Sequence, residues 1–156
     1  MKQSNKLKLY LTVIIITIIV ILFMRPMRIN ANFFDTETYT IHKTTIDFID
    51  GVPTMNVEQY YFEKGSMEYK HITDALQQIA YHRGYETITS EVTKEFELNE
   101  TSSIRIYNDQ LSSIEVTNIN QIRINNVVYF GDYFGNKYTK ETHNKIDQQL
   151  KTPQSE

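Results

Sequence analysis

The residues with the clearest potential for metal chemistry are the four histidines. His71 and His82 lie eleven positions apart, which on one helix separates them by about 16 Å, too far for a single ion. His42 and His143 have no histidine or cysteine at the spacing of a zinc motif. The chain has no cysteine, so thiolate ligands and cysteine nucleophiles are absent. We therefore expect no metal site and no cofactor.

Carboxylates cluster in one segment, at Glu91, Glu95, Glu97 and Glu100. On a strand, Glu95 and Glu97 would share a face, as the carboxylate pair of a glycoside hydrolase requires. Charged side chains on the solvated face of a strand are far more common than such a pair. The sequence also contains no G-x-S-x-G, S-x-x-K or P-loop motif. We therefore predict that the protein is not an enzyme and has no catalytic residues.

Aromatic residues are the one surplus, with eleven Tyr, eight Phe and no Trp. They are concentrated in the segments YYF at 60–62 and YFGDYF at 129–134. Neighbouring side chains of a strand point to opposite faces, so alternate aromatics enter the core and the others stay exposed. The candidates for binding a peptide or glycan are Tyr60, Tyr61, Tyr129 and Tyr133. The competing interpretation is that these tyrosines fill a small core and keep their hydroxyls at its rim.

An uncharged run of sixteen residues, 9–24 (LYLTVIIITIIVILFM), precedes everything discussed above. As a helix it spans about 24 Å, and Leu7 with the aliphatic stem of Lys8 extends it toward the ~30 Å of a hydrocarbon core. Arg25-Pro26 is expected to end the helix, because proline removes a donor and disfavours helix in the preceding residue. We interpret the run as a single-pass anchor in a lipid bilayer.

Two other interpretations of this run were considered. A cleaved signal peptide has a similar length and basic start, with the only candidate cleavage site after Ala31. That site has Ile29 rather than alanine at its outer position, and two arginines precede it. A buried helix of a soluble protein would need wrapping on every side by a small domain. The anchor is therefore the leading interpretation.

The charges favour a cytoplasmic N-terminus and a domain on the outer side. Three lysines precede the run and two arginines follow it. The positive-inside rule states that the flank with more Lys and Arg stays in the cytoplasm, so it favours a cytoplasmic N-terminus. After residue 31 the chain has eleven basic and nineteen acidic residues, a net charge of −8. Such a domain lacks the basic surface that binds phosphate backbones, so we expect no nucleic-acid partner. Abundant Asn, Ile, Lys and Tyr are typical of AT-rich bacterial genomes and, with the anchor and the lack of cysteine, indicate a Gram-positive cell envelope.

The chain is expected to divide into five parts. A basic tip at 1–8 and the anchor at 9–24 are followed by a connector at 25–37. The folded domain covers 38–150, and 151–156 form a disordered tail.

Within the domain, period-two and period-three-to-four patterns predict the elements. A strand at 38–49 leads to a turn at 50–53, where Pro53 is expected to stop pairing, and 55–62 form either the return strand of a hairpin or an extended crossover. A helix begins after Ser66 as N-cap and ends near Gly84. Strands are predicted at 85–98, 104–107, 114–117, 122–124 and 127–134, with Asn125-Asn126 as a type I′ turn. A final helix with Thr139 as cap buries Ile146 and Leu150.

These elements predict an α+β fold in which one main helix covers an antiparallel meander and a short helix ends the domain. We expect a non-catalytic, membrane-anchored extracytoplasmic domain of a cell envelope that binds another envelope protein or peptide through a sheet edge or tyrosine face. The alternative is a secreted protein with a cleaved signal peptide that binds a small molecule or glycan.

Overall fold

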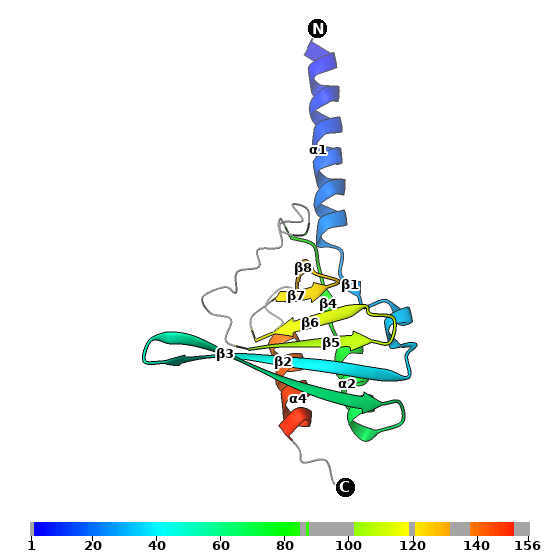
Figure 1. Ribbon diagram of the computed structural model, residues 1–156. Coiled ribbons are helices and arrows are strands. Elements are labelled where there is room, and N and C mark those ends of the chain that lie inside the picture. The colour runs from blue at the N-terminus through cyan, green and yellow to red at the C-terminus, as the bar shows by residue number, and fades with distance from the viewer. Residues whose placement is uncertain (1, 85–86, 88–101, 119–120, 132–137, 152–156) are drawn as a thin grey trace.

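The computed structural model describes residues 2–84, 87, 102–118, 121–131 and 138–151. It shows the expected α+β fold, in which an apolar N-terminal helix leads into a six-stranded antiparallel sheet with helices packed on one face (Figure 1). Apart from Thr87, the predicted strand at 85–98 lies outside the described residues, as do the glutamates at 91, 95, 97 and 100.

Helix α1 (Lys2–Met24) contains the apolar run and ends immediately before Arg25-Pro26, as predicted. Its segment Lys6–Phe23 has a mean hydropathy of 2.4, and no part of it is buried against the domain. By length and composition this helix is able to span a membrane, a criterion that a signal sequence also meets.

The sheet is antiparallel throughout, with strand order β3-β2-β5-β6-β7-β8. Its strands are β2 (Thr38–Ile49), β3 (Val52–Glu63), β5 (Ser102–Asn108), β6 (Ser113–Thr117), β7 (Gln121–Ile124) and β8 (Val127–Phe130). The 55–62 segment is therefore the return strand of a hairpin and not a crossover. β3 and β8 form the two edges.

Within the described residues, the sheet is covered by two helices, where the sequence predicted one main helix. α2 (Met67–Gln77) and α4 (Tyr138–Lys151) pack against each other on the same side, α4 against β5 and β6 and α2 against β3 (Figure 1). The core between the layers contains the fully buried Ile72, Leu76 and Ile146, together with isoleucines from β2, β5 and β6. The apolar stripe of α4 contains only Ile146 and Leu150. These two residues are enough to pack the helix against the sheet, because α4 lies over the central strands β5 and β6.

Helix α2 begins as predicted but ends earlier. The Ser66 hydroxyl accepts a hydrogen bond from the Tyr69 backbone N–H, which confirms the N-cap. The predicted end near Gly84 is wrong, because Ala80 and Tyr81 form strand β4 (Ala80–Tyr81). The next residue, His82, exchanges backbone hydrogen bonds with Phe130 at the end of β8. Pairing with other strands thus outcompetes helix continuation after Gln77.

The segment expected to be a connector contributes to the folded domain. Strand β1 (Met27–Arg28) pairs with β4, and the 3-10 helix η1 (Ala31–Phe34) follows it. Ile29 and Phe33 are buried in the core. The apolar side chains of this segment are too few to show a period, so the sequence pattern did not reveal its packing.

Both predicted tight turns have the geometry of type I′ turns. Asn125 and Asn126 have φ of 49° and 68°, and Asp50 and Gly51 have φ of 52° and 78°. Two positive φ values match the right-handed twist of the flanking strands, and Asn, Asp and Gly tolerate them.

The start of α4 differs from the expected one. The helix begins at Tyr138, so Thr139 lies in its first turn and is not the N-cap. Thr139 is fully buried against Gly131, where an added Cβ would lie 1.5 Å from its hydroxyl oxygen. The lack of a side chain at Gly131 therefore allows the first turn of α4 to pack closely against this residue.

Removal of β1 should destabilise the domain. We expect a fragment of residues 32–156 to be less stable than one of residues 26–156 by about 1.5–3 kcal/mol, the value of burying one Ile side chain. Chemical denaturation of the two fragments measures the difference. Ile29→Ala in the longer fragment is the matched control and should reproduce most of the loss. Equal stability of the two fragments would show that β1 is dispensable.

Candidate interaction surface on the β2–β3 ribbon

The β2–β3 hairpin is the longest pairing in the sheet and extends beyond the rest of it. The two strands pair over all twelve residues, from Thr38↔Glu63 to Ile49↔Val52. Among the described residues, β5 pairs with β2 from Tyr39 to Thr45 and no further. The closed end of the hairpin leaves the body sideways relative to α1 (Figure 1). We call the whole hairpin, residues 38–63, the ribbon, and its part from 46 to 57 the distal ribbon.

The helix side of this ribbon changes from apolar to polar at one residue. Tyr39 and Ile41 are fully buried there. The next residue on that face is Lys43, whose ammonium lies 2.6 Å from a carboxylate oxygen of Asp147 on α4. Thr45 and Asp47 follow, and Asp47 is exposed. Next to the turn, the exposed pair Ile49 and Val52 lies on this same face. The helical cover of the ribbon therefore ends at Lys43.

The Lys43–Asp147 pair belongs to a short polar chain across the base of the ribbon. Glu58 lies 4.0 Å from the Lys43 ammonium, and its carboxylate accepts a 2.6 Å hydrogen bond from the Tyr60 hydroxyl. This hydrogen bond, with a smaller effect of burial, raises the pKa of Tyr60 to about 12. Burial raises the pKa of Asp147, but hydrogen bonds from Lys151 and Lys43 outweigh it and the net pKa is lowered. Side chains from β2, β3 and α4 thus hold the ribbon where its cover stops.

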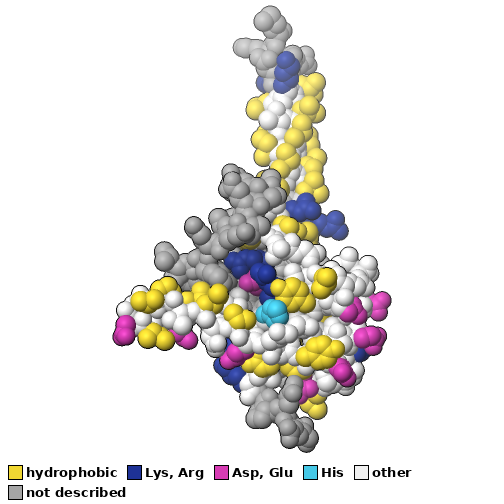
Figure 2. All heavy atoms as spheres, viewed as in Figure 1, with side chains coloured by type: hydrophobic (Ala, Val, Ile, Leu, Met, Phe, Trp, Pro, Cys, Tyr) yellow, Lys and Arg dark blue, Asp and Glu magenta, His cyan; other side chains and the backbone are white. Residues whose placement is uncertain are grey.

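The opposite side of the distal ribbon is apolar. Alternation along the strands and the register Ile46↔Met55, Phe48↔Pro53 and Thr44↔Val57 place five apolar residues on one face. We call them the apolar distal face: Ile46, Phe48, Pro53, Met55 and Val57. Phe48, Met55 and Val57 are 64%, 61% and 54% exposed. Figure 2 shows hydrophobic atoms gathered on the projecting ribbon, with acidic atoms at its end.

This apolar face is not a continuation of the core. The buried residues of the ribbon's base face the helices, whereas the apolar distal face lies on the other side of the same strands. A one-residue phase change in the hydrophobic pattern after Lys43 puts Ile46 and Phe48 on the face opposite to Ile41, and only Ile49 at the turn returns to the helix side. Folding of the described part of the domain leaves Ile46 partly buried and the other four side chains of the apolar distal face exposed.

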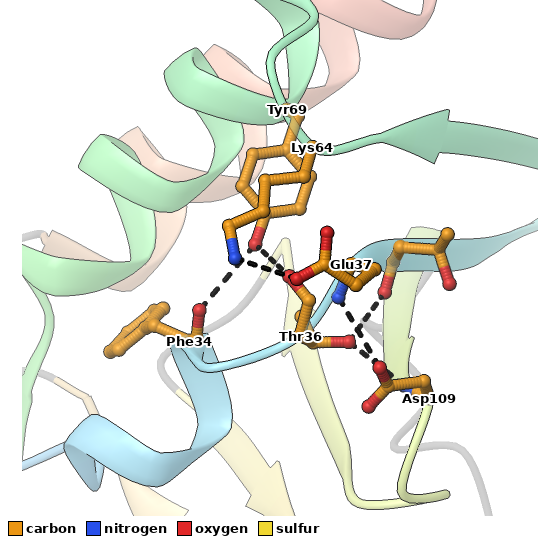
Figure 3. Close-up of polar contacts among 7 residues, drawn as sticks. Phe34, Thr36, Glu37, Lys64, Tyr69 and Asp109 are labelled. Carbon is orange, nitrogen blue, oxygen red and sulfur yellow. Dashed lines mark hydrogen bonds and ion pairs between the residues drawn. The ribbon is translucent and has the colours of Figure 1, made fainter.

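The start of the ribbon is held by backbone-directed hydrogen bonds (Figure 3). The Tyr69 hydroxyl of α2 donates to the carbonyl of Thr36 at 2.9 Å, and Asp109 accepts from the Glu37 backbone N–H at 3.2 Å. The backbone N–H of Asp109 in turn donates to the Thr36 hydroxyl at 3.1 Å. Lys64 closes the cluster with a 2.8 Å ion pair to Glu37. These contacts fix the chain where it enters β2.

An aromatic stack supports the same end. The rings of Phe33, Tyr39 and Tyr69 lie in succession, with centroids 5.9 Å and 4.4 Å apart and nearly parallel planes. Burial raises the pKa of the Tyr39 hydroxyl, which accepts a hydrogen bond from Thr73. A firmly held base gives the projecting ribbon a fixed direction.

β3 is an edge strand, and no strand in the described part of the chain pairs with its outer side. In a two-residue hairpin the pair next to the turn is hydrogen-bonded, and hydrogen-bonded pairs alternate from there. The outward backbone groups of β3 therefore belong to Pro53, Met55, Val57, Gln59 and Tyr61. The expectation that Pro53 stops pairing is wrong, because its missing N–H faces this free edge and costs the β2–β3 ladder nothing.

The ribbon is uniformly acidic. Residues 47–63 contain Asp47, Asp50, Glu58 and Glu63 and no Lys or Arg. The basic residues on either side are engaged, Lys43 with Asp147 and Lys64 with Glu37. The free edge therefore carries negative charge at both ends.

The four tyrosines proposed from the sequence do not form one surface. Tyr60 faces the helix side, whereas Tyr61 is 55% exposed on the opposite face of the same edge strand. Tyr129 lies on β8, at the other edge of the sheet, and packs edge-on against Tyr81 at 4.9 Å. Tyr133 lies outside the described residues. Of the four, only Tyr61 borders the ribbon surface on its exposed side.

The described histidines do not gather with acidic residues into a group that would hold a metal ion. His71 lies 2.9 Å from Gln149 in a groove of about 220 Å³ between α2 and α4. Lys145 in the same groove donates to Gln78 at 3.2 Å. Four of the polar side chains that line this groove are thus paired with each other across it.

One pairing that the sequence analysis missed is Ser102 with His143. The Ser102 hydroxyl lies 3.1 Å from His143 Nε2, and His143 is only 4% exposed. Nucleophilic catalysis by such a pair requires substrate access to the imidazole and a group that orients it. Burial of the ring between α4 and β5 denies that access, so the pair joins the helix to the sheet. The two residues are far apart in sequence and form no motif.

The sheet face away from the helices carries a buried ion cluster. Glu115 on β6 accepts hydrogen bonds from Arg105 on β5, and Arg123 on β7 lies 3.2 Å from its other oxygen. These three residues are directly opposite one another in register. Cross-strand pairing therefore satisfies the charges of this face in place of hydrophobic burial.

Comparison with protein-family models, with curated proteins and with solved structures finds no match for this chain.

The buried histidine should make stability depend on pH. Burial lowers the pKa of His143, against smaller opposing effects of Asn144 and Asp147. The unfolded chain then binds a proton more readily than the folded one, so stability is fully present above pH ~6.5 and falls as pH drops below it. We expect His143→Gln to flatten this loss in denaturant titrations between pH 7.5 and 5. His71→Gln is the matched control, and an unchanged slope in the His143 variant would contradict the assignment.

Proposed function

We propose that this protein is a non-catalytic domain, anchored by α1 on the outer side of a bacterial and specifically Gram-positive membrane, that binds another envelope protein. The observation that carries the proposal is the apolar distal face. Soluble proteins rarely expose a contiguous patch of large apolar side chains unless the patch binds another molecule. Phe48 and Met55 are the residues we expect at its centre, since large buried side chains dominate interface energies.

As an anchor, α1 would hold this surface near a membrane, and two observations argue against insertion of the surface into the bilayer. The charge bias around α1 favours an outer domain, and the ribbon runs sideways from the body (Figure 1). Asp47 and Asp50 at its end carry the same sign as anionic lipid headgroups. A protein partner therefore suits the ribbon better than the bilayer surface.

Retention of α1 as an anchor also agrees with the packing that follows it. Cleavage after Ala31 would separate β1 and Ile29 from the domain, although β1 pairs with β4 and Ile29 is buried. The alternative, a secreted protein that binds a small molecule or glycan, requires that loss. Intact mass of the mature protein distinguishes the two, because cleavage would leave Asn32 as its first residue.

Site-specific photo-crosslinking in intact cells tests the proposal. A benzophenone amino acid placed at Phe48 should give one defined crosslinked protein. The matched control is the same probe at Leu111, an apolar residue that is 84% exposed in the turn between β5 and β6. Leu111 should give no such product, because it lies outside the ribbon.

A second substitution checks that the crosslink reports a specific contact. Met55→Asp, combined with the probe at Phe48, should abolish the product while leaving thermal stability nearly unchanged, since Met55 is exposed. Absence of a product at Phe48, equal products at Phe48 and Leu111, or persistence in the Met55→Asp variant would contradict the proposed function.

A further inference from the structure

We propose that the partner binds by adding an extended, cationic segment as a seventh, antiparallel strand along the outer edge of β3, from Met55 to Tyr61. The inference rests on the proposed function and specifies its partner. It combines three properties of the ribbon that are independent of one another: the free backbone groups, the charge, and the position of the edge relative to α1.

The backbone of this edge is prepared for pairing. Met55, Val57, Gln59 and Tyr61 direct both their N–H and C=O groups outward by register. A strand of about seven residues spans this stretch. Pro53 offers a carbonyl but no N–H, so the ladder ends there. The outward residues also carry their side chains on the face of Phe48, so backbone pairing and apolar contact use the same face of an added strand.

The charge selects the kind of segment. The ribbon from 47 to 63 has four acidic residues and no basic one. Lysine or arginine at the ends of the added strand would lie near Glu63 at one end and Asp47 and Asp50 at the other. An acidic segment would be repelled from both ends. Complementary charge gives such pairing specificity and a fast association rate.

The position of the edge excludes a second copy of this chain in the same membrane. α1 leads into β1, β1 pairs with β4, and the following His82 bridges to the end of β8. β3 is therefore the edge opposite α1, five strand spacings or about 24 Å from β8, as Figure 1 shows. A two-fold axis that joins β3 to β3 would turn the second α1 to the opposite side. Two copies paired in this way cannot both enter one bilayer from the same side, so the strand comes from a different protein.

Defined peptides test this inference on the full chain in nanodiscs of neutral phosphatidylcholine. The probe is a fluorescent peptide with alternating Val and Thr residues and a Lys at each end. The matched peptide has Glu in place of both lysines. Fluorescence anisotropy should show binding of the Lys peptide only, weakened by added salt, with empty nanodiscs as the blank.

Backbone methylation of the Lys peptide tests the pairing itself. In an antiparallel pair, the residues that share a face with Val57 also point their N–H groups at β3. N-methylation of the valines should therefore weaken binding by about tenfold or more, whereas N-methylation of the threonines should leave it unchanged. Side-chain attraction alone would not distinguish the two peptides.

The reciprocal change in the protein is Val57→Pro. The N–H it removes points away from β2, so the hairpin should persist, as thermal unfolding can verify. Binding should fall by about tenfold or more, and Val57→Ala, which keeps the N–H, should weaken it less.

The outcomes separate this inference from the proposed function. Equal binding of the Lys and Glu peptides, equal effects of the two methylation patterns, or no binding of the Lys peptide would overturn strand addition. If a crosslink from Phe48 still formed in cells, the proposed function would stand without it. Loss of both results would reject the two together.

Discussion

The ion pair between Lys43 and Asp147 lies where the helical cover of the sheet ends. On the helix side of this point, α2 and α4 bury isoleucines from the central strands. Beyond it, the twelve-residue strands of the ribbon continue past the helical layer that the described residues form. A buried lysine requires a partner, because removal of one member of such a pair costs about 3–5 kcal/mol. The pair therefore holds α4 to the ribbon's base and sets how much of the ribbon projects.

The projecting part follows from this limit. Where the strands extend past the helical layer, both of their faces are exposed. Here most of the apolar side chains, those of the apolar distal face, lie on the face away from α4. The base is rigidly held by the ring stack on Tyr39 and by the hydrogen bonds around Thr36. The result is an acidic hairpin with a held base, an apolar distal face and an outer edge that no described strand pairs with. We propose that this combination serves a strand-donating partner.

The sequence predicted elements whose signals are local. Asp50-Gly51 and Asn125-Asn126 marked their turns, Ser66 marked the start of α2, and the apolar run marked α1 to its last residue. It could not predict pairings between distant segments. β1 with β4, Ser102 with His143, and the packing of Ile29 depend on the tertiary arrangement and leave no periodic trace. The prediction of where α2 ends was wrong for this reason. His82, Arg83 and Gly84 resemble the end of a helix in sequence, but the helix ends at Gln77.

The surface was only partly predictable. The sequence predicted binding through an exposed sheet edge or a tyrosine face. Two of the proposed tyrosines instead contact neighbouring side chains, Tyr129 that of Tyr81 and Tyr60 that of Glu58. The informative signal was the phase of alternation in the stretch IHKTTIDFI, where Ile41 before Lys43 has an odd number and Ile46 and Phe48 after it have even numbers, before Ile49 at the turn returns to an odd number. That shift has meaning only once the register and the extent of the helical cover are known.

Amide hydrogen exchange along β3 is the most direct test of the central claim. In purified protein, the outward amides of Met55, Val57, Gln59 and Tyr61 should exchange fast, and the inward amides of Asn56, Glu58 and Tyr60 slowly. In native envelope membranes, the outward amides should become protected as well. Outward amides that exchange equally fast in both preparations would contradict the account.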